Sequence, residues 1–393
     1  MQRSASASGR IEVVQHFCEE DSEALNLVIE AFEHRHGGVS VENTGVHISQ
    51  LRLHVKNRVL QQDPPDVWVE WPGANIEPSL STAVADVTDL WTETGMDSQF
   101  VAEAKRNARF DGRYRCVPID IYRVNNVFYN AGYLEEAGVD PTRPSSPSAF
   151  LEMLDALDEA LDVAPLILFG RDPFGACQFW ESLLVAHGGP RAYRDVTAGD
   201  AADHRDAVRA ALETLDAALA YTPEDMEFLT SADADGRFAR REGAVHVNGL
   251  WALGRMAGVE GFEYGPDWGH VPLPGTGDTF LLSMNALVPS SQSADDEGVR
   301  EFLAFAGSVE GLATFDAAVG GVPPRADVPV EDFHPLIREQ KRALNRADTQ
   351  LSSMTHGLGI SPEKLVGFKS AVATYLRDRD VDAGTEALVE ALS

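Results

Sequence analysis

The sequence predicts an α/β protein built from two lobes, and three observations lead to this fold class. The chain has 393 residues, which is too long for one ordinary core and favours two domains of about 150–200 residues each. Short apolar strands alternate with helices in the first part of the chain, as in a parallel sheet covered by helices. Short β segments that contain proline recur at three places far apart in the sequence.

The first elements follow this alternation of strand and helix. Residues 10–14 are expected to form a strand, and the helix after it carries apolar side chains at helical spacing from Leu25 to Phe32. A second strand at 39–43, a second helix and a third strand at 66–71 complete the series. This order indicates a parallel sheet, because parallel neighbours are joined through a crossover helix.

The middle and last parts of the chain continue the mixed pattern. Residues 114–123 and 125–130 are rich in β-branched and aromatic side chains and are predicted as two strands. A helix is expected to begin at Ser146-Pro147, because serine caps a helix and proline fits its first turn. Further strands are expected at 164–170, 243–248, 269–275 and 280–289.

Three β segments interrupted by prolines are predicted to carry the chain from one lobe to the other. A strand that bridges two lobes lacks sheet partners on every side, so proline removes few ladder hydrogen bonds there. Its outward side chains would face a wet cleft, which would explain why the first segment carries Asp120, Tyr122 and Arg123. The three segments are 117–124, 271–275 and 322–328.

Composition excludes several classes of function. The formal net charge is −30, from 62 acidic and 32 basic residues, so the surface repels nucleic acid and anionic lipid. The acidic residues are spread along the whole chain, which favours adaptation to high salt over a dedicated acidic binding surface. No apolar segment has transmembrane length, and the N-terminal residues lack the apolar core of a secretion signal. Residues 1–9 are expected to form a flexible tether.

The three cysteines, Cys18, Cys116 and Cys177, do not predict a disulfide framework or a zinc site. Their number is odd and no CxxC spacing occurs. His16 and Cys18 alone are too weak a pair for a metal site. No metal and no cofactor is expected.

A series of segments, in this order, carries a family resemblance. They are "RIEVV", "DPPDVWVEW", "DGRYRCVPIDIYRVNNVFYNAGYLEEAGVDPTRPSSPSAFLEML", "FARREGAVHVNGLWALG", "GHVPLPG", "FLAFAGSVEGLATF" and "MTHGLGISPEKLVGFKSAVATYL". The series resembles the family 1 extracellular solute-binding proteins of ABC sugar importers, and within them the glucose/mannose-type sugar-binding proteins.

The resemblance implies a two-lobed, periplasmic-binding-protein-like fold of type II with three crossing strands. Lobe one would comprise residues 10–119 and 272–322, and lobe two residues 124–270 and 327–393. The implied function is an extracytoplasmic receptor, not an enzyme, that closes on a mono- or small oligosaccharide and passes it to a membrane permease. A monomer anchored to the cell surface, with its signal or lipid anchor absent from this chain, is expected.

A sugar offers apolar faces and a rim of hydroxyl groups, so its site needs aromatic walls beside polar groups. Strand ends in α/β sheets present such groups. Trp251 matches a ring-stacking tryptophan of the family, and His356 matches a polar ligand contact. Met284 and Asn285 stand where the glucose binders often have an acidic residue, which puts glucose in doubt. The candidate ligand-binding residues are His16, Phe17, Glu70, Trp71, Asp120, Tyr122, Arg123, Asn248, Trp251 and His356.

Two other functions remain open from the sequence. The same fold would suit a polyol, a glycerol phosphodiester or a peptide, although Arg123 is the single basic candidate near the first crossing for a phosphate. A glycosidase with Glu70 and Asp120 as its carboxylates is less favoured, because acidic residues occur everywhere and no catalytic motif is present. Trp180 is expected in a core rather than in the site.

Overall fold

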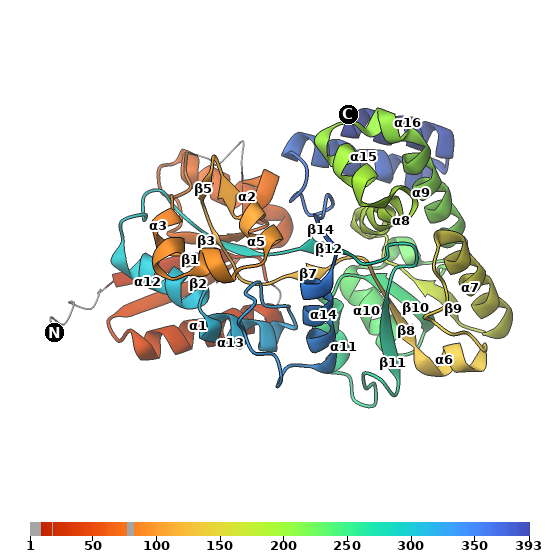
Figure 1. Cartoon of the computed structure of the whole chain (residues 1–393), viewed down its shortest axis with the longest axis horizontal. Helices are drawn as coiled ribbons and strands as arrows, with labels where there is room; N and C mark the ends of the chain where they lie inside the picture. The colour runs from red at the N-terminus through yellow and green to blue at the C-terminus, as the bar shows by residue number, and fades with distance from the viewer. Residues whose placement is uncertain (1–8, 18, 77–81) are drawn as a thin grey trace. The chain divides into compact units, whose positions relative to one another are not determined.

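The computed structural model describes residues 9–17, 19–76 and 82–393, and its chain divides into two compact units (Figure 1). Unit 1 consists of the chain up to Ile121 together with residues 284–341, and unit 2 of residues 122–283 and 342–393. The tether expected at 1–9, apart from Gly9, and Cys18 lie outside the described residues.

Unit 1 is built around a five-stranded sheet of order β2-β1-β3-β13-β6. The strand β1 is parallel to both β2 and β3, as the alternation of strands and helices predicts. Its elements are β1 (Gly9–Gln15), α1 (Glu19–Arg35), β2 (Val39–Gly45), α2 (Ile48–Leu60), β3 (Val67–Glu70), η1 (Gly73–Asn75), α3 (Thr88–Glu93), α4 (Met96–Gln99), α5 (Ala102–Asn107), β4 (Arg109–Phe110), β5 (Arg113–Tyr114), β6 (Val117–Pro118), β13 (Ala286–Pro289), α12 (Glu297–Ala306) and α13 (Val309–Val319).

Helices α1, α12 and α13 pack together beside β1 and β2 in unit 1 (Figure 1). Phe32 of α1 is fully buried and contacts Phe302 of α12, with ring centroids 5.3 Å apart. No single helix among the described residues has the length and apolar composition of a membrane span. The pair α12 and α13 meets that test together across a bend of 61°.

Unit 2 contains a four-stranded sheet of order β11-β8-β10-β9 and a three-stranded sheet of order β14-β12-β7. Its elements are β7 (Tyr122–Arg123), β8 (Asn126–Asn130), α6 (Ala131–Glu136), α7 (Pro147–Ala160), β9 (Ala164–Ile167), α8 (Phe174–Ala198), η2 (Ala201–His204), α9 (Arg205–Ala218), η3 (Leu219–Tyr221), η4 (Met226–Phe228), α10 (Ser231–Ala239), β10 (Gly243–Asn248), α11 (Ala252–Ala257), β11 (Trp268–Pro272), β12 (Thr279–Ser283), β14 (Thr349–Ser352), α15 (Pro362–Asp378) and α16 (Val381–Leu392).

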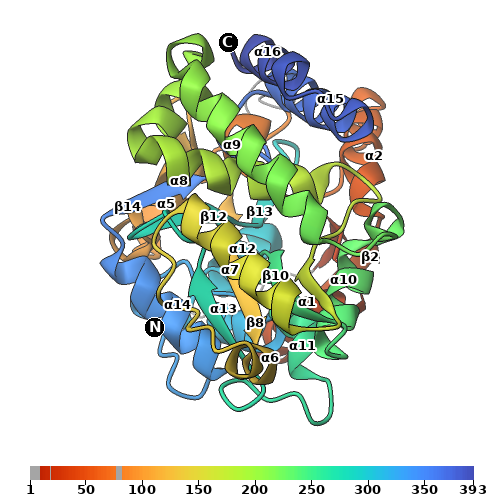
Figure 2. The same ribbon diagram turned by 90° about the vertical axis from the view of Figure 1, so that its right-hand side faces the viewer.

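The helices of unit 2 show how local sequence sets their ends. Ser146 caps α7 by accepting a hydrogen bond from the backbone N–H of Ala149, and Pro147 is its first residue, as predicted. Helix α8 is broken at Gly189, which has a φ of 71° and stands directly before Pro190. Glycine adopts this left-handed conformation readily, and a residue before proline disfavours the helical one. Figure 2 shows α8, α9, α15 and α16 packed into one helical group. Buried side chains of these helices belong to the core of unit 2.

The chain passes between the units at three places, and two of them differ from the sequence prediction. The first, at Ile121–Tyr122, falls inside the predicted segment 117–124. The second falls at Ser283–Met284, in the middle of the single strand expected at 280–289, which is in fact the two strands β12 and β13 of different sheets. The third falls at Lys341–Arg342, inside α14 (Pro335–Arg346).

At 271–275 and 322–328, the segments predicted as the second and third crossings, proline marks other features of the structure. Pro272 ends β11, an edge strand, where a missing N–H costs little. Pro323 belongs to a loop of unit 1, and its carbonyl accepts a hydrogen bond of 2.8 Å from Nζ of Lys341. The real second crossing contains no proline, so its sequence looks like an uninterrupted strand.

Polarity in the first crossing segment comes from hydrogen bonds within each unit and not from exposure to solvent. The carboxylate of Asp120 accepts hydrogen bonds from the backbone N (2.6 Å) and the side-chain Nδ2 (2.8 Å) of Asn285. Arg123 donates from Nη2 to the carbonyl of Thr279 at 3.1 Å. Because these partners lie more than 150 residues away, the sequence alone could not show them.

Candidate functional site

Unit 2 brings four aromatic side chains into one continuous series, which we call the aromatic row: Tyr122, Trp251, His356 and Phe174. Neighbouring rings meet edge to face, at centroid distances of 6.0 Å for Tyr122 and Trp251, 5.3 Å for Trp251 and His356, and 5.0 Å for His356 and Phe174. Three of the four were predicted as ligand-binding residues. Phe174, which opens α8, was missed because it follows an ordinary Asp-Pro helix start.

The position of Trp251 is set by a tight turn after β10. Asn248, the last residue of that strand, accepts a hydrogen bond from the backbone N of Gly249 through Oδ1 (2.8 Å). A Cβ atom at Gly249 would lie only 2.1 Å from the ring of Trp251, so glycine is required there. The predicted ligand residue Asn248 thus holds the turn that presents Trp251.

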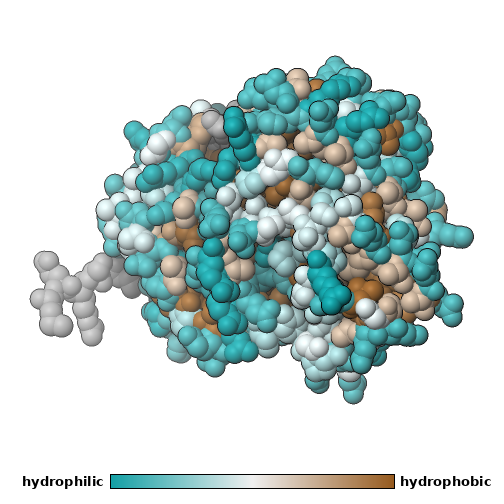
Figure 3. Space-filling model, turned by 45° about the vertical axis from the view of Figure 1, so that its right-hand side comes forward, coloured by the Kyte–Doolittle hydropathy of each residue, from teal (hydrophilic) through white to brown (hydrophobic). Residues whose placement is uncertain are grey.

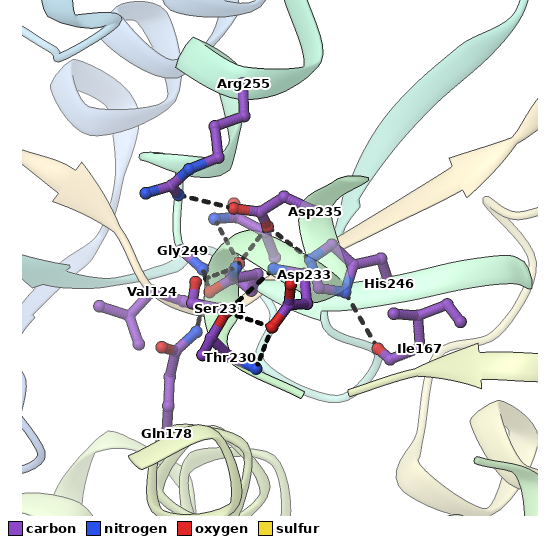
Figure 4. Close-up of polar contacts among 12 residues, drawn as sticks. Val124, Ile167, Gln178, Thr230, Ser231, Asp233, Asp235, His246, Gly249 and Arg255 are labelled. Carbon is purple, nitrogen blue, oxygen red and sulfur yellow. Dashed lines mark hydrogen bonds and ion pairs between the residues drawn. The ribbon is translucent and has the colours of Figure 1, made fainter. Parts of the chain in front are cut away.

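Asp235 of α10 fixes this turn through its hydrogen bonds (Figure 4). It is fully buried, and its Oδ1 accepts hydrogen bonds from Nδ2 of Asn248 (2.8 Å) and Nε2 of His246 (2.9 Å). Its Oδ2 accepts from Nη1 of Arg255, in α11, at 2.8 Å. One carboxylate therefore ties together α10, β10 and α11, the elements on both sides of Trp251.

His356 is held by a second buried carboxylate, Glu181 of α8. Glu181 accepts hydrogen bonds from Oγ of Ser353 (2.6 Å), the backbone N of Met354 (2.7 Å) and the hydroxyl of Tyr193 (2.9 Å). Oγ of Ser353 lies 2.8 Å from Nδ1 of His356. Glu181 therefore fixes the loop 353–356 after β14, and no pattern in the sequence indicates this role.

The electrostatics of this region keep the imidazole neutral. Burial lowers the pKa of His356 well below its ordinary value, and the positive charge of Lys369 lowers it further. Burial raises the pKa of the Glu181 carboxyl, an effect opposed by its hydrogen bonds from Ser353 and Tyr193. A neutral imidazole beside Trp251 has one donor and one acceptor nitrogen, which suits the hydroxyl groups of an uncharged ring.

Unit 1 gathers a smaller aromatic group at the carboxyl ends of β1 and β3. The ring of His16 lies 5.9 Å from that of Trp71 and 5.2 Å from that of Phe17, which in turn lies 5.6 Å from Phe315 of α13. The strands β1 and β3 are parallel neighbours, so their carboxyl ends meet at one edge of the sheet. Three of the predicted ligand-binding residues, His16, Phe17 and Trp71, therefore lie together at this edge.

His16 carries an unsatisfied buried atom. Its Nε2 has no hydrogen-bond partner among the described residues, and burial lowers its pKa from 6.5 to about 4. An unpaired buried polar atom costs free energy, about 1–3 kcal/mol, that a suitable ligand atom would recover. His16 is therefore as well placed for a ligand as Phe17, although the sequence favoured Phe17.

The two predicted carboxylates of unit 1 differ in their surroundings. Glu70 is buried and accepts a hydrogen bond from the backbone N of Trp71 at 3.1 Å. Burial raises its pKa, while the charge of Arg52 acts in the opposite direction. Both oxygens of Asp120 are occupied by Asn285. Asp120 thus acts on the backbone of its own unit.

The remaining sequence expectations concern Met284, Arg123 and Trp180. Met284 is fully buried in the structure. Arg123 lies over the ring of Phe280 at 5.0 Å, and burial lowers its pKa to about 10, so it remains charged at neutral pH. Trp180 is fully buried in the core of unit 2, against Phe368, as expected.

Among the residues that the structure describes, no group of three or more His, Cys, Asp or Glu side chains is arranged to hold a metal ion. Cys116 and Cys177 are buried and free, and burial raises the pKa of both thiols. These thiols are therefore protonated at neutral pH and poor metal ligands.

Comparison with known proteins places the chain among solute receptors. A model of the bacterial extracellular solute-binding protein family matches residues 28–336. The xylose/arabinose-binding protein XacG of Haloferax volcanii is 27% identical over 395 aligned residues, which cover 99% of this chain and 85% of that protein.

Solved structures show the same fold. A chitin oligosaccharide binding protein superimposes with a TM-score of 0.85 at 19% identity, covering 98% of each chain. The solute receptor AcbH, described as having an exclusive preference for β-D-galactopyranose, superimposes with a TM-score of 0.84 at 15% identity, covering 98% of this chain and 97% of that one. These matches confirm the two-lobed α/β fold of type II periplasmic-binding proteins that the sequence predicts. The chain belongs to the bacterial extracellular solute-binding protein family.

Proposed function

We propose that this chain is the receptor subunit of an ABC importer that captures a mono- or small oligosaccharide outside the cytoplasm and delivers it to a membrane permease. The observation that carries the proposal is the aromatic row of unit 2, in which a half-buried tryptophan adjoins a neutral imidazole. Trp251 offers a flat apolar face for the C–H side of a sugar ring, and His356 offers hydrogen bonds to its hydroxyl groups.

The aromatic group of unit 1 supports the same proposal independently. His16 contributes a buried nitrogen without a partner among the described residues, and Trp71 contributes a second indole beside it. Relatives add further support, since XacG is named for binding xylose and arabinose. We propose that Phe17 and Glu70 lie at the edge of the sugar contacts in unit 1. We propose further that Asp120, Arg123 and Asn248 do not contact the sugar but position the backbone of their own units.

Members of this family are binding proteins, and the geometry gives no support to a glycosidase. A glycosidase needs two carboxyl groups about 5–10 Å apart on either side of the scissile bond. Asp120 is fully buried and accepts hydrogen bonds from Asn285 at both oxygens, which supports a structural role for this carboxylate. We further propose that the receptor acts as a monomer and is anchored to the cell surface.

Two measurements test the proposed function. Mass spectrometry of small molecules released from gently purified protein identifies a retained solute, and calorimetry in molar salt then measures affinity for a panel of neutral and acidic sugars. We expect a sugar among the released molecules and a micromolar Kd, about −8 kcal/mol. Release of a polyol, a glycerol phosphodiester or a peptide, with no sugar bound in the panel, would overturn the substrate class.

A further inference from the structure

Lys369 of α15 extends the aromatic row by a positive charge. Its Nζ lies 5.2 Å from the centroid of the Phe174 ring, and Phe174 in turn meets His356 edge to face. The series Tyr122, Trp251, His356, Phe174 thus ends in an ammonium group that comes from a different helix. The charge also reaches His356, whose pKa it lowers.

This ammonium group has no hydrogen bond and no ion pair with any residue that the structure describes. The other lysine of the same helix behaves differently, because Nζ of Lys364 donates to the carbonyl of Leu392 at 3.2 Å. Lys341 likewise donates to the carbonyl of Pro323. Lys369 is half-buried, so its ammonium group is not fully hydrated either.

The acidic groups near Lys369 are already engaged elsewhere. Glu181 accepts its hydrogen bonds from Ser353, Met354 and Tyr193, and Asp172 accepts one from the backbone N of Phe174 at 2.8 Å. Both carboxylates act on Lys369 through space, yet burial outweighs them and lowers its pKa. A cation–π contact with Phe174 recovers only part of the lost hydration.

A half-buried, unpaired ammonium group calls for an anion. A carboxylate in contact with it would form a charge-assisted hydrogen bond, roughly twice as strong as one to a neutral hydroxyl group. Because His356 is neutral and the aromatic row offers apolar ring faces, the molecule that fits this end carries a sugar ring and an acidic group together. The alternative is that Lys369 only covers Phe174 with its aliphatic stem and takes no part in binding.

We propose that Lys369 binds a carboxylate of the solute, so that the receptor takes an acidic sugar, a uronic acid, in preference to the neutral sugar of the same configuration. This inference rests on the proposed sugar-receptor function and adds the chemical class of its substrate. It assigns to Lys369 a specificity-determining contact at the Phe174 end of the aromatic row.

Calorimetry with paired solutes tests this inference: D-glucuronate against D-glucose and D-xylose, and D-galacturonate against D-galactose. We expect the wild-type protein to bind an acid at least about tenfold more tightly than its neutral partner. The variant Lys369→Met should lose that preference, and Lys369→Arg should keep most of it. The matched control is Arg377→Met, which removes one charge from an exposed side chain of the same helix. It should leave the affinities for the acids and for the neutral sugars unchanged.

The outcomes separate failure of the inference from failure of the proposed function. Tighter binding of the neutral sugars, or a preference for acids that survives in Lys369→Met, overturns the role of Lys369 and leaves a sugar receptor. Binding of none of these solutes, with a solute of another class found in the purified protein, overturns both. Thermal melts of each variant, with the acid and without it, show whether a loss of affinity reflects the contact or a loss of fold.

Discussion

At the scale of single residues, polar side chains in the two candidate regions fall into two kinds. Some have their hydrogen-bonding atoms engaged within their own unit, as Asp120 does with Asn285 and Asn248 does with Gly249 and Asp235. Others keep buried atoms without a partner among the described residues, as His16 and Asp316 do. The first kind positions backbone, whereas the second kind is suited to a ligand or a proton.

Trp251 provides the first test at this scale. Replacing it with alanine removes the ring that adjoins both Tyr122 and His356, so we expect affinity for the sugar identified by the calorimetric panel to fall about tenfold or more. The control is Phe228→Ala, which removes an aromatic ring that is 69% exposed in the same unit. Equal affinities of the two variants would exclude Trp251 from the site.

Asp316 of α13 provides a test through pH. Burial raises the pKa of its carboxyl well above the ordinary value, and the neighbouring charge of Asp120 raises it further. The folded protein therefore keeps a proton there that the unfolded chain releases near pH 4, so this group costs stability increasingly as pH rises through that window. Asp316→Asn cannot ionise, and we expect it to raise the free energy of unfolding at pH 7 by at least about 1 kcal/mol.

The gain from Asp316→Asn should shrink toward zero near pH 4, as measured by chemical denaturation at several pH values. Asp327→Asn is a control of opposite sign, because the hydrogen bond from Arg325 lowers the pKa of Asp327. That carboxylate adds stability above the unfolded pKa, so its variant should lose stability at neutral pH. A pH-independent effect of Asp316→Asn would show that this carboxyl is not protonated in the fold.

At the scale of elements, apolar runs and helical periodicity predicted several strands and helices, because strands β3 and β10 are buried throughout and α7 buries one face. Strands β1, β2 and β3, helix α7 and strand β10 lie where the pattern placed them. The passages between units could not be found in this way. The expected strand at 280–289 contains only two polar residues, Ser283 and Asn285, and it is the pairing of β12 with β14 and of β13 with β3 that shows that it divides.

The candidate site was predictable in part for the same physical reason. Aromatic side chains at strand ends, Trp71 and Trp251, are visible in the sequence because their size and position are unusual for a turn. The carboxylates that hold the site residues in place are not visible in this way. Glu181 lies in the middle of an apolar helix, and Asp235 lies in an ordinary acidic stretch. Their roles depend on partners that the fold brings from elsewhere, such as Ser353 for Glu181.

Asp235 tests how elements are joined around Trp251. In Asp235→Asn an amide nitrogen must face one of the donors on His246, Asn248 or Arg255, so we expect a loss of about 1–3 kcal/mol in stability and a weaker affinity for the sugar. The control Asp233→Asn lies on the same helix and weakens only its capping box with Thr230. It should cost about 1 kcal/mol or less and leave affinity unchanged. Equal losses of affinity in both variants would show that general destabilisation, not the turn, controls binding.

At the scale of the whole molecule, charge is the dominant feature. The net charge is −30, and the face drawn in Figure 3 is mainly hydrophilic, with apolar side chains scattered over it. The described ion pairs are mostly exposed, as for Arg205 with Glu386 and Arg209 with Asp382, and exposed pairs contribute little. Repulsion among the excess carboxylates therefore has to be reduced by the solvent.

Salt should accordingly stabilise this protein through screening. The Debye length falls from about 10 Å at 0.1 M salt to about 3 Å at 1 M, which is short enough to suppress repulsion between most surface carboxylates. We expect the melting temperature to rise steeply with NaCl up to about 1 M and then to level off, with KCl giving the same curve. At pH 4.5, where many exposed carboxylates are protonated, the rise should be smaller. The opposite result would be a melting temperature that stays flat below about 0.5 M salt and rises only at higher salt, more with sulfate than with chloride at equal ionic strength. That result would indicate strengthened burial of apolar surface and would contradict the screening argument.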